Sequence, residues 1–413
     1  MSRVILGDIA ISQTGPFGSQ LHEEDYVSEG TPIVTVEHLG DTNFTHQNLP
    51  FVSEADTKRL SKYILIEGDI VFSRVGSIDR NVYVDKNHEG WMFSGRCIRV
   101  RADKNKVNPR YLSYYFKQNS FKKMMMNLAV GATMPSLNTK IMNSIELDLL
   151  PRENQDKIAN ILSAIDDKIQ INNQINQELE AMAKTLYDYW FVQFDFPDQN
   201  CKPYKSSGGK MVYNPELKRE IPEGWGVAKL NEVVDLISGY PFSSNDYVTS
   251  GKYKLYTIKN VQDGYTVDKV DNYLDFLPSN MSHECQLRRG DLIMSLTGNV
   301  GRVGIVYEDN VLLNQRVLKL NPNNKTHKSF IYSFFRSDVT KAHLEKMSTG
   351  TSQKNLSPID IGNMMIPLAS EDLLSKFLDY LNVLESNLVE NQQLTQLRDW
   401  LLPMLMNGQV KVE

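Results

Sequence analysis

The chain has 413 residues, of which 41% are hydrophobic and 23% are charged, as is ordinary for a globular protein. This length predicts two or three domains, and no apolar run reaches the roughly 18 residues that a membrane-spanning helix needs. The three cysteines lie far apart, which argues against a disulfide scaffold or a zinc cluster and fits a reducing cytoplasm. The net charge of −5 argues against a uniformly basic nucleic-acid-binding protein.

The charges are distributed unevenly along the chain. Residues 1–57 carry one Lys or Arg against nine acids, whereas residues 58–123 carry 15 against six and residues 286–354 carry 11 against five. Two basic stretches within an acidic chain favour contact with nucleic acid. The alternative is that they form the solvated faces of strands and loops.

The chain contains an internal repeat. Gly68 and Asp69 begin a nine-residue run that matches the run beginning at Gly290, 222 residues later, with Gly, Asp, Ser and Gly in equivalent places. Further matched pairs follow in the same order, at offsets that loop insertions and deletions would shift: Arg80 and Arg302, Arg96 and Arg316, Phe116 and Phe335, Gly131 and Gly350, Leu137 and Leu356, and Pro151 and Pro367. Two divergent copies of one unit, each a domain followed by a helix, therefore make up most of the chain.

The elements predict an α+β protein in which two pseudo-symmetric domains, each a mixture of helix and strand, are joined by two long antiparallel helices. The predicted segments in chain order are a first domain at 1–150, a long helix at 151–192, an extended linker at 193–225, a second domain at 226–368, and a second long helix and tail at 369–413. Short β-branched runs predict the strands of each domain. A helix at 110–126 and another at 329–347 carry aromatic residues, which are either core or platforms for stacking bases.

Both long helices show coiled-coil-like spacing of apolar residues. The residues that we expect in the seam are Ile158, Leu162, Ile165, Ile169, Leu179, Leu186, Leu374, Leu381, Leu388, Leu394 and Leu401. Because neither helix could bury this stripe alone, we expect them to pack on each other, although each could instead pack only on its own domain. A register shift near Asn172 and the position of Asn391 predict a polar layer within the seam.

Motifs for catalysis are largely missing from the sequence. It has neither the phosphate loop of ATP-driven motors nor the Asn/Asp-Pro-Pro-aromatic tetrapeptide of amino-methyltransferases, and its seven histidines show no metal-ligand spacing. Asp198, Glu216 and Lys218 match a loose nuclease pattern, but they lie in the polar linker. We therefore predict no catalytic residues, no metal site and no cofactor in this chain.

Two basic domains on a helical scaffold suit recognition of a two-part site in double-stranded DNA. The candidate DNA-binding residues are Arg74, Arg80, Arg96, Arg99, Arg302, Arg316 and Lys354. The arginines that recur in both copies contact phosphates or form a shared structural ion pair. Arg74 has Leu296 as its counterpart, which favours Arg74 for base recognition in one half only.

The order of these features resembles that of the specificity subunit of type I restriction–modification enzymes, over nearly the full length. The motifs that carry the resemblance are the Gly-Asp turns, the proline before each long helix, and the segments 194–197, 201–209 and 219–225. Departures follow Gly131 and Gly350. The resemblance implies two target-recognition domains, and helices that set the spacer and dock two modification subunits. It also implies that S-adenosylmethionine, ATP and Mg²⁺ belong to the modification and restriction subunits of a cytoplasmic prokaryotic complex.

Two other classes of function remain open at this stage. The chain could be a DNA nickase or methyltransferase with an unrecognised site, which metal- or S-adenosylmethionine-dependent activity of the purified chain would reveal. It could also be a structural adaptor that uses its long helices and does not bind DNA. In that case the assembled complex would lack DNA affinity at any salt concentration.

Overall fold

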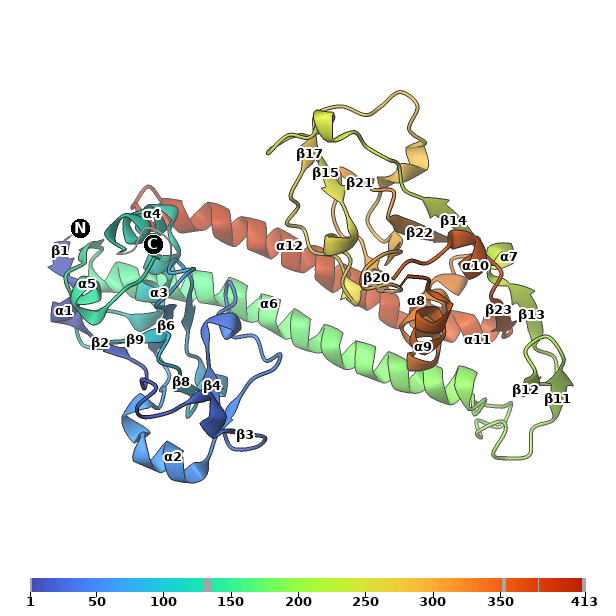
Figure 1. The fold of residues 1–413 in the computed structure, drawn as a ribbon, viewed down its shortest axis with the longest axis horizontal. Coiled ribbons are helices and arrows are strands. Elements are labelled where there is room, and N and C mark those ends of the chain that lie inside the picture. The colour runs from blue at the N-terminus through green and yellow to red at the C-terminus, as the bar shows by residue number, and fades with distance from the viewer. Residues whose placement is uncertain (1, 130–134, 351–353, 378, 411–413) are drawn as a thin grey trace. The chain divides into compact units, whose positions relative to one another are not determined.

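The computed structural model describes residues 2–129, 135–350, 354–377 and 379–410 (Figure 1). The chain divides into two compact units, one formed by residues 1–169 and 394–413 and the other by residues 170–393. The division cuts both long helices, so each unit contains one domain together with a segment of each helix. We call residues 1–169 with 394–413 unit 1, and residues 170–393 unit 2.

Unit 1 contains two four-stranded sheets. The first has the order β2-β9-β6-β7 and is antiparallel throughout, and the second has the order β3-β5-β4-β8. The strands of the first sheet are β2 (Ala10–Thr14), β9 (Cys97–Ala102), β6 (Asp69–Ser73) and β7 (Asn81–Tyr83). Those of the second are β3 (Tyr26–Val27), β5 (Phe51–Val52), β4 (Thr31–Val34) and β8 (Met92–Phe93). A further pair, β1 (Ser2–Ile5) and β10 (Glu146–Leu149), joins the two ends of the domain.

The helices of the unit 1 domain pack on the first sheet. They are α1 (Leu6–Ile9), α3 (Pro109–Lys117), α4 (Asn119–Leu128) and α5 (Thr139–Asn143), while α2 (Glu54–Arg59) lies nearer the second sheet (Figure 1). Asn108 caps α3 by accepting from the backbone N–H of Tyr111, and Pro109 fits the first helical turn. Phe116 stacks edge-on against Phe72 of β6, and both are fully buried. Phe116 of α3 is therefore a core residue rather than a platform for stacking bases.

Unit 2 repeats this architecture with one additional strand. Its larger sheet has the order β14-β22-β19-β20-β16 and its smaller sheet the order β17-β15-β21-β18. The strands are β14 (Val234–Ser238), β22 (Val317–Pro322), β19 (Leu292–Ser295), β20 (Val303–Ile305), β16 (Gly264–Tyr265), β17 (Tyr273–Leu274), β15 (Tyr253–Tyr256), β21 (Val311–Leu313) and β18 (Gln286–Leu287). The remaining elements are the pair β13 (Gly226–Lys229) and β23 (Met365–Leu368) and the helices α7 (Leu230–Val233), α8 (His327–Arg336), α9 (Asp338–Met347) and α10 (Pro358–Gly362). The repeat in the sequence is thus a repeat in the fold.

The Gly-Asp turns show how closely the two copies match. Gly68 and Gly290 both adopt positive φ, at 99° and 86°, a conformation that favours glycine. The backbone N–H of Ser73 donates to the carbonyl of Arg80 at 3.0 Å, and Ser295 donates to Arg302 at the same distance. Recurrence of these bonds confirms the alignment of the two copies.

The two long helices are antiparallel. They are α6 (Arg152–Tyr187) and, in two pieces, α11 (Glu371–Lys376) and α12 (Asp379–Met406). In unit 1, Ile158 and Leu162 near the start of α6 share a buried core with Leu405 near the end of α12. In unit 2, Tyr187 at the end of α6 shares a core with Leu381 near the start of α12. The helices pack both on each other and on the domains.

An asparagine layer interrupts the seam in unit 2, as the sequence predicts. Asn172 Nδ2 donates to Asn391 Oδ1 at 2.9 Å, and Asn391 Nδ2 donates to Asn173 Oδ1 at 2.8 Å. One turn away, Asn387 Nδ2 donates to Asn176 Oδ1 at 2.8 Å. Asn172 is 1% exposed, so this layer is part of the interior. Paired amides of this kind favour one register of the two helices over its neighbours.

The burial of the predicted seam residues is uneven. Ile158, Leu162, Leu374 and Leu381 are buried, whereas Ile165, Ile169, Leu179, Leu186, Leu388, Leu394 and Leu401 are only partly buried. On α12 burial does not follow polarity, because Leu397 is 44% exposed while the side chain of Arg398 is 13% exposed. The heptad that passes through Asn391 continues to Arg398 and Leu405, so the arginine occupies a seam position.

The segment predicted to be an extended linker is instead folded. It contains the hairpin of β11 (Met211–Asn214) and β12 (Arg219–Pro222). Phe196 stacks on Tyr204 and on Trp225, with ring centroids 4.7 and 5.3 Å apart. Asp195 accepts hydrogen bonds from the backbone N–H and the hydroxyl of Ser206. The polar composition misled the prediction because a few aromatic residues suffice to fold a short segment.

No helix among the residues that the structure describes is long and apolar enough to cross a membrane.

Candidate nucleic-acid interface

In unit 1 the structure brings three of the candidate arginines to one end of the strands of the first sheet. Arg74 directly follows β6, Arg80 directly precedes β7, and Arg96 directly precedes β9. Ser73 pairs with Cys97 and Phe72 with Asn81, so these strand ends are neighbours. The carbonyl of Arg96 accepts from the backbone N–H of Arg74 at 2.8 Å.

The equivalent edge of unit 2 carries Arg302, Arg316 and Lys354. Arg302 precedes β20 and Arg316 precedes β22. The carbonyl of Lys354 accepts from the backbone N–H of Gly298 at 3.1 Å, which places this lysine beside the same turn. We call these two sets of strand ends the recognition edges of unit 1 and unit 2.

Most cations on the recognition edges are open to solvent. Arg80, Arg96, Arg316 and Lys354 are exposed, although Lys354 Nζ pairs with Glu345 at 3.0 Å. Arg302 is half-buried, and its Nη1 donates to Gln262 Oε1 at 3.1 Å. Exposed guanidinium groups at strand ends are able to contact phosphates without disturbing the sheet.

Arg74 is more constrained than its sequence context suggests. Its Nη1 and Nε donate to the carbonyls of Gly95 and Leu137 at 3.1 and 3.3 Å, and its guanidinium lies 5.3 Å from the ring centroid of Phe17. The side chain lines a hollow of about 700 Å³ that Arg96 also lines. Arg74 therefore joins three segments around this hollow in addition to any contact with DNA.

The matching hollow of unit 2 differs in chemistry. It has a volume of about 520 Å³ and is lined by Leu296 and Arg316, together with Thr297 and Asn355. Leu296 takes the place of Arg74, while Arg316 takes the place of Arg96. The two hollows therefore share one arginine position and differ at the position next to it.

The structure corrects the assignment of Arg99 as a DNA-binding residue. It is 5% exposed, and its Nη1 donates to the carbonyls of Lys62 and Ile64, both at 3.2 Å, while Nη2 donates to Gln13. An arginine held in this way cannot reach DNA, so Arg99 does not belong to the interface. Its position on strand β9 resembled that of Arg96, and only the fold distinguishes the two.

The acid of each Gly-Asp turn has a structural role. Asp69 is fully buried and accepts two hydrogen bonds of 2.7 Å from Arg101, and in unit 2 Asp291 accepts from Lys319 at 2.8 Å. Each acid also accepts from a backbone N–H three residues earlier. The repeated motif therefore fastens the turn to the neighbouring strand.

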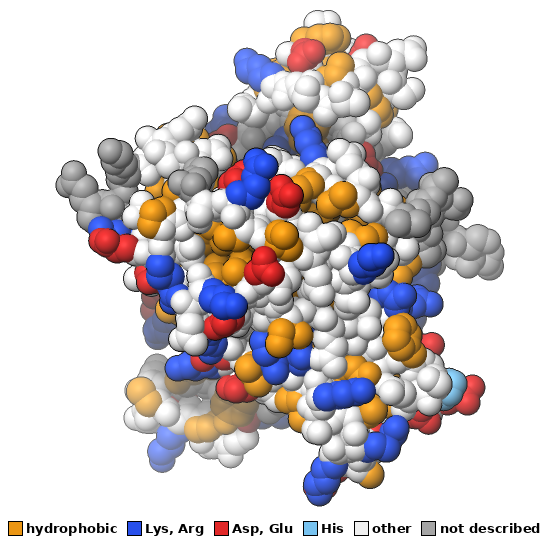
Figure 2. All heavy atoms as spheres, turned by 90° about the vertical axis from the view of Figure 1, so that its left-hand side faces the viewer, with side chains coloured by type: hydrophobic (Ala, Val, Ile, Leu, Met, Phe, Trp, Pro, Cys, Tyr) orange, Lys and Arg blue, Asp and Glu red, His pale blue; other side chains and the backbone are white. Residues whose placement is uncertain are grey.

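The surface of unit 1 is chemically mixed. On the side that includes β1 and α5, lysine and arginine side chains lie among acidic and apolar ones rather than in one continuous patch (Figure 2). The net charge of a stretch of sequence therefore does not locate the interface, and the strand ends are the better guide.

The nuclease-like pattern has no structural support. Asp198 Oδ1 accepts from the backbone N–H groups of Asn200 and Lys202, as in a tight turn. Within the described ranges, no group of three or more His, Cys, Asp and Glu residues is arranged to hold a metal ion.

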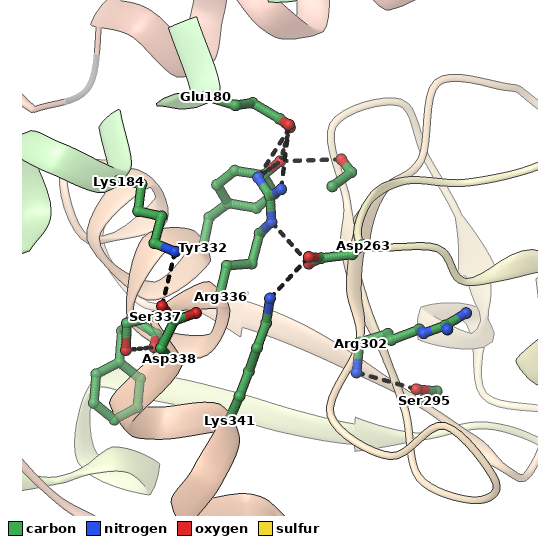
Figure 3. Close-up of polar contacts among 12 residues, drawn as sticks. Glu180, Lys184, Asp263, Ser295, Arg302, Tyr332, Arg336, Ser337, Asp338 and Lys341 are labelled. Atoms are coloured by element: carbon green, nitrogen blue, oxygen red, sulfur yellow. Dashed lines mark hydrogen bonds and ion pairs between the residues drawn. The ribbon is translucent and has the colours of Figure 1, made fainter. Parts of the chain in front are cut away.

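Two polar clusters on α6 escaped the sequence analysis. In unit 1, Asp166 Oδ2 accepts from Tyr114 Oη at 2.6 Å, and Asp166 Oδ1 accepts from Arg398 at 2.9 Å. In unit 2, Glu180 is bonded to Tyr332 and Arg336 of α8 (Figure 3). In each cluster the sequence shows only a charged residue within the apolar stripe of α6. Its partners could not be identified, because they lie more than 50 residues away in the chain.

The chain matches a family model described as type I restriction modification DNA specificity domain over residues 2–181 and 222–398. It is 27% identical to the type I restriction enzyme MjaIX specificity subunit of Methanocaldococcus jannaschii, covering 94% of this chain and 89% of that protein. It is 24% identical to the HindI specificity subunit of Haemophilus influenzae, covering 92% and 95%. Among solved structures, the type I restriction-modification S subunit of M. genitalium matches with a TM-score of 0.54 at 15% identity, covering 100% of this chain and 96% of that one.

Proposed function

The chain belongs to the type I restriction modification DNA specificity family, and we propose that its two recognition edges each read one half of a bipartite site in duplex DNA. The observation that carries this proposal is the recurrence of arginines at equivalent strand ends: Arg80 with Arg302, and Arg96 with Arg316. One protein surface presented twice fits a DNA site with two parts.

We assign phosphate contacts to the shared positions and sequence discrimination to the positions that differ. Phosphate contacts fix the position of a domain on the duplex and carry no sequence information. Arg74 in unit 1 and Leu296 in unit 2 border the two hollows, so the halves offer different chemistry to base edges. An arginine there favours guanine, whereas Leu296 is 5% exposed and packs in the core of unit 2, so the second half has no guanine-reading side chain at this position.

The long helices are proposed to dock two modification subunits and to set the length of the spacer. Ile171, Ile175 and Met182 of α6 are 40–68% exposed, and their spacing places them on one face of the helix. Such a face is suited to an apolar partner. In unit 2 a different face of this helix is already buried by the asparagine layer.

The chemistry is proposed to belong to the partner subunits. Adenine methylation would use S-adenosylmethionine held by the modification subunits, and cleavage would use ATP and Mg²⁺ in restriction subunits of a cytoplasmic prokaryotic complex. This chain would contribute recognition and no catalytic group.

The test uses the chain assembled with its modification subunits on a randomised DNA library. Sequencing the methylated adenines should return a two-part motif, and exchanging residues 1–150 for those of a relative should change one half only. A change in both halves, or in neither, would contradict separate recognition. Failure of the assembled complex to bind DNA would favour the adaptor, and methylation by the chain alone would favour an enzyme.

Single replacements separate the two kinds of contact. Arg80→Ala or Arg302→Ala should weaken binding to all sequences and lower the salt dependence by about one phosphate contact. Arg74→Ala should cost roughly 1–3 kcal/mol on the cognate site and little on other DNA. An Arg74→Ala complex with the original rate, site and salt dependence would rule out that assignment.

Spacer selection has its own test. A helix rises about 1.5 Å per residue and DNA about 3.4 Å per base pair, so inserting four residues into each long helix should lengthen the preferred spacer by one or two base pairs. An unchanged spacer preference would contradict this role of the helices.

A further inference from the structure

Arg336, the last residue of α8, connects three separate elements of unit 2 (Figure 3). Its Nη1 and Nη2 donate to the two carboxylate oxygens of Glu180 on α6, at 2.9 and 3.2 Å. Its Nε donates to Asp263 Oδ1 at 2.9 Å, in the loop before β16. The guanidinium also donates to Tyr332 Oη at 2.7 Å and lies over the tyrosine ring. Each nitrogen of the planar guanidinium thus has an assigned partner, a geometry that a lysine does not reproduce.

Arg336 and Asp263 are both charged at neutral pH. Burial opposes the charge on Arg336, but Tyr332, Glu180 and Asp263 outweigh that effect and raise its pKa. Burial likewise opposes the charge on Asp263, yet Arg336 and Lys341 together lower the pKa of its carboxyl. A hollow of about 280 Å³ opens beside these side chains. Close packing does not hold the guanidinium on that side, so the hydrogen bonds fix its position.

The loop that Arg336 holds leads directly to the recognition edge. Gln262 precedes Asp263, and its Oε1 accepts from Arg302 Nη1 at 3.1 Å. Strand β16 pairs in parallel with β20, the strand that Arg302 precedes. The hydroxyl of Thr266, which directly follows β16, donates to the carbonyl of Ile305 at 3.1 Å, so the far end of β16 is also tied to β20. A continuous series of contacts therefore runs from Glu180 through Arg336, the loop and Gln262 to Arg302.

Gly264 provides independent evidence that this approach is close. Its φ is +104°, and a Cβ built there would lie 2.6 Å from Glu180 Oε1 and 3.0 Å from Arg336 Nη2. Any side chain at position 264 would displace the carboxylate or the guanidinium. The positive φ favours glycine at this position, and the absence of a side chain leaves the carboxylate and the guanidinium in contact.

The first copy is built differently. Lys117 occupies the position equivalent to Arg336, because Phe116 and Phe335 are matched. Its ammonium lies 5.7 Å from the ring centroid of Tyr114. Among the residues that the structure describes, the first sheet of unit 1 ends at β7 and has no strand that corresponds to β16. This connection between a long helix and a recognition edge thus belongs to the second copy.

We infer that Arg336 is a positioning residue that holds Arg302, and with it the recognition edge of unit 2, in a fixed place relative to helix α6. The inference rests on the proposed function, because it concerns how one half of the DNA site is read. Arg336 itself touches no DNA in this proposal. It acts through Asp263 and Gln262 on the arginine that does.

The experiment compares substitution profiles of the methylated site. Complexes containing wild-type chain, Arg336→Met or Arg336→Lys are given DNA in which each half-site is varied in turn. In the half read by residues 226–368, Arg336→Met should lower discrimination about tenfold, because the whole recognition edge, and not the Arg302 phosphate contact alone, loses its fixed place over the bases. In the half read by residues 1–150 it should leave discrimination unchanged. Arg336→Lys keeps the positive charge but lacks the planar guanidinium with its several donors, so it should recover only part of the lost discrimination.

Lys184→Met is the matched control. Lys184 lies four residues beyond Glu180 on α6, and its Nζ pairs with Asp338 of α9 at 2.8 Å (Figure 3). This pair also joins α6 to the domain, but it is exposed and does not touch the loop at Asp263. Its loss should leave both halves of the profile unchanged.

The outcomes separate this inference from the proposed function. If wild-type complexes modify DNA without sequence preference, the proposed function fails. If wild type is selective and Arg336→Met slows methylation equally on all sequences, Arg336 supports only the fold or the Arg302 phosphate contact, and its role in positioning the recognition edge is overturned. Equal loss of discrimination in both halves would overturn it as well. Glu180→Gln should reproduce the Arg336→Met profile, and an unaltered profile in that variant would count against the link to α6.

Discussion

In unit 1 the acid of helix α6 that faces the domain is Asp166, which is partly buried, and in unit 2 it is Glu180. Both accept a hydrogen bond from a domain tyrosine, Tyr114 or Tyr332. The cation, however, comes from different places. Arg398 of helix α12 pairs with Asp166, whereas Arg336 of the domain pairs with Glu180.

The difference separates two tasks that a scaffold must perform. The Asp166 pair lies between the two long helices and fastens them to each other. The Glu180 pair lies between a long helix and a domain and continues toward the recognition edge through Asp263. Breaking the first should therefore affect stability, and breaking the second should affect how DNA is read.

The largest effect on stability is expected from Arg398→Ala. The side chains of Arg398 and Asp166 are each 13% exposed, and removal of one partner leaves a buried charge without its counterion. Such changes cost about 3–5 kcal/mol, which a lowered urea midpoint of the chain would report. The neighbouring Asp399 is 60% exposed, so Asp399→Ala should change the midpoint little. An equal shift in both variants would show that Asp166 is not the important partner.

A smaller loss is expected in the asparagine layer. Asn172→Leu would remove the amide that donates to Asn391 Oδ1 and leave this oxygen without its donor, which should cost about 1–3 kcal/mol. Adding Asn391→Leu should recover much of that stability and loosen the register of the helices. Cysteine cross-linking at matched and offset positions measures the register. A double variant that cross-links only in the native register would refute the role of the layer.

Lys117 provides a pH-dependent comparison within unit 1. Burial lowers its pKa to about 8 from an ordinary 10.5, with Asp166 opposing the shift and nearby Arg398 adding to it. Below pH 8 the lysine is charged in both the folded and unfolded states, and the fold bears the cost of burying that charge. Between pH 8 and 10.5 only the unfolded chain remains protonated, so stability should rise with pH. Lys117→Met should stabilise the chain most at neutral pH, with the advantage shrinking over that range in unfolding titrations. An advantage independent of pH would contradict the assignment.

The smallest effect is expected for Lys184→Met. The side chains of Lys184 and Asp338 are 52% and 75% exposed, and an exposed ion pair contributes less than about 1 kcal/mol. A thermal melting temperature within a degree or two of wild type would agree with this. A large drop would mean that the domain of unit 2 depends on its surface pair more than on Arg336.

Local patterns predicted the parts of the fold that depend on neighbouring residues. The Gly-Asp turns revealed the repeat because positive φ and a buried carboxylate require those residue types. The register shift near Asn172 predicted the polar layer because asparagine is unfavourable in an apolar seam unless it is paired.

Contacts between distant residues could not be predicted from the sequence. Arg99 and Arg96 belong to the same basic stretch, yet one is buried against the carbonyls of Lys62 and Ile64 and the other is exposed. Nothing in the local sequence indicates the partner of Arg398, because that acid lies 232 positions earlier. The departures after Gly131 and Gly350 fall largely at 131–133 and 351–352, outside the described residues.

The glycine at position 264 also sets a rule for building chimaeras. A foreign second domain grafted onto these helices would meet Glu180, a residue that does not travel with the graft. A donor with a bulkier residue at this position would seat badly even if its own sheet folded correctly. Compatibility at this junction could be screened from sequence alone, by requiring a glycine at 264 together with an arginine at 336.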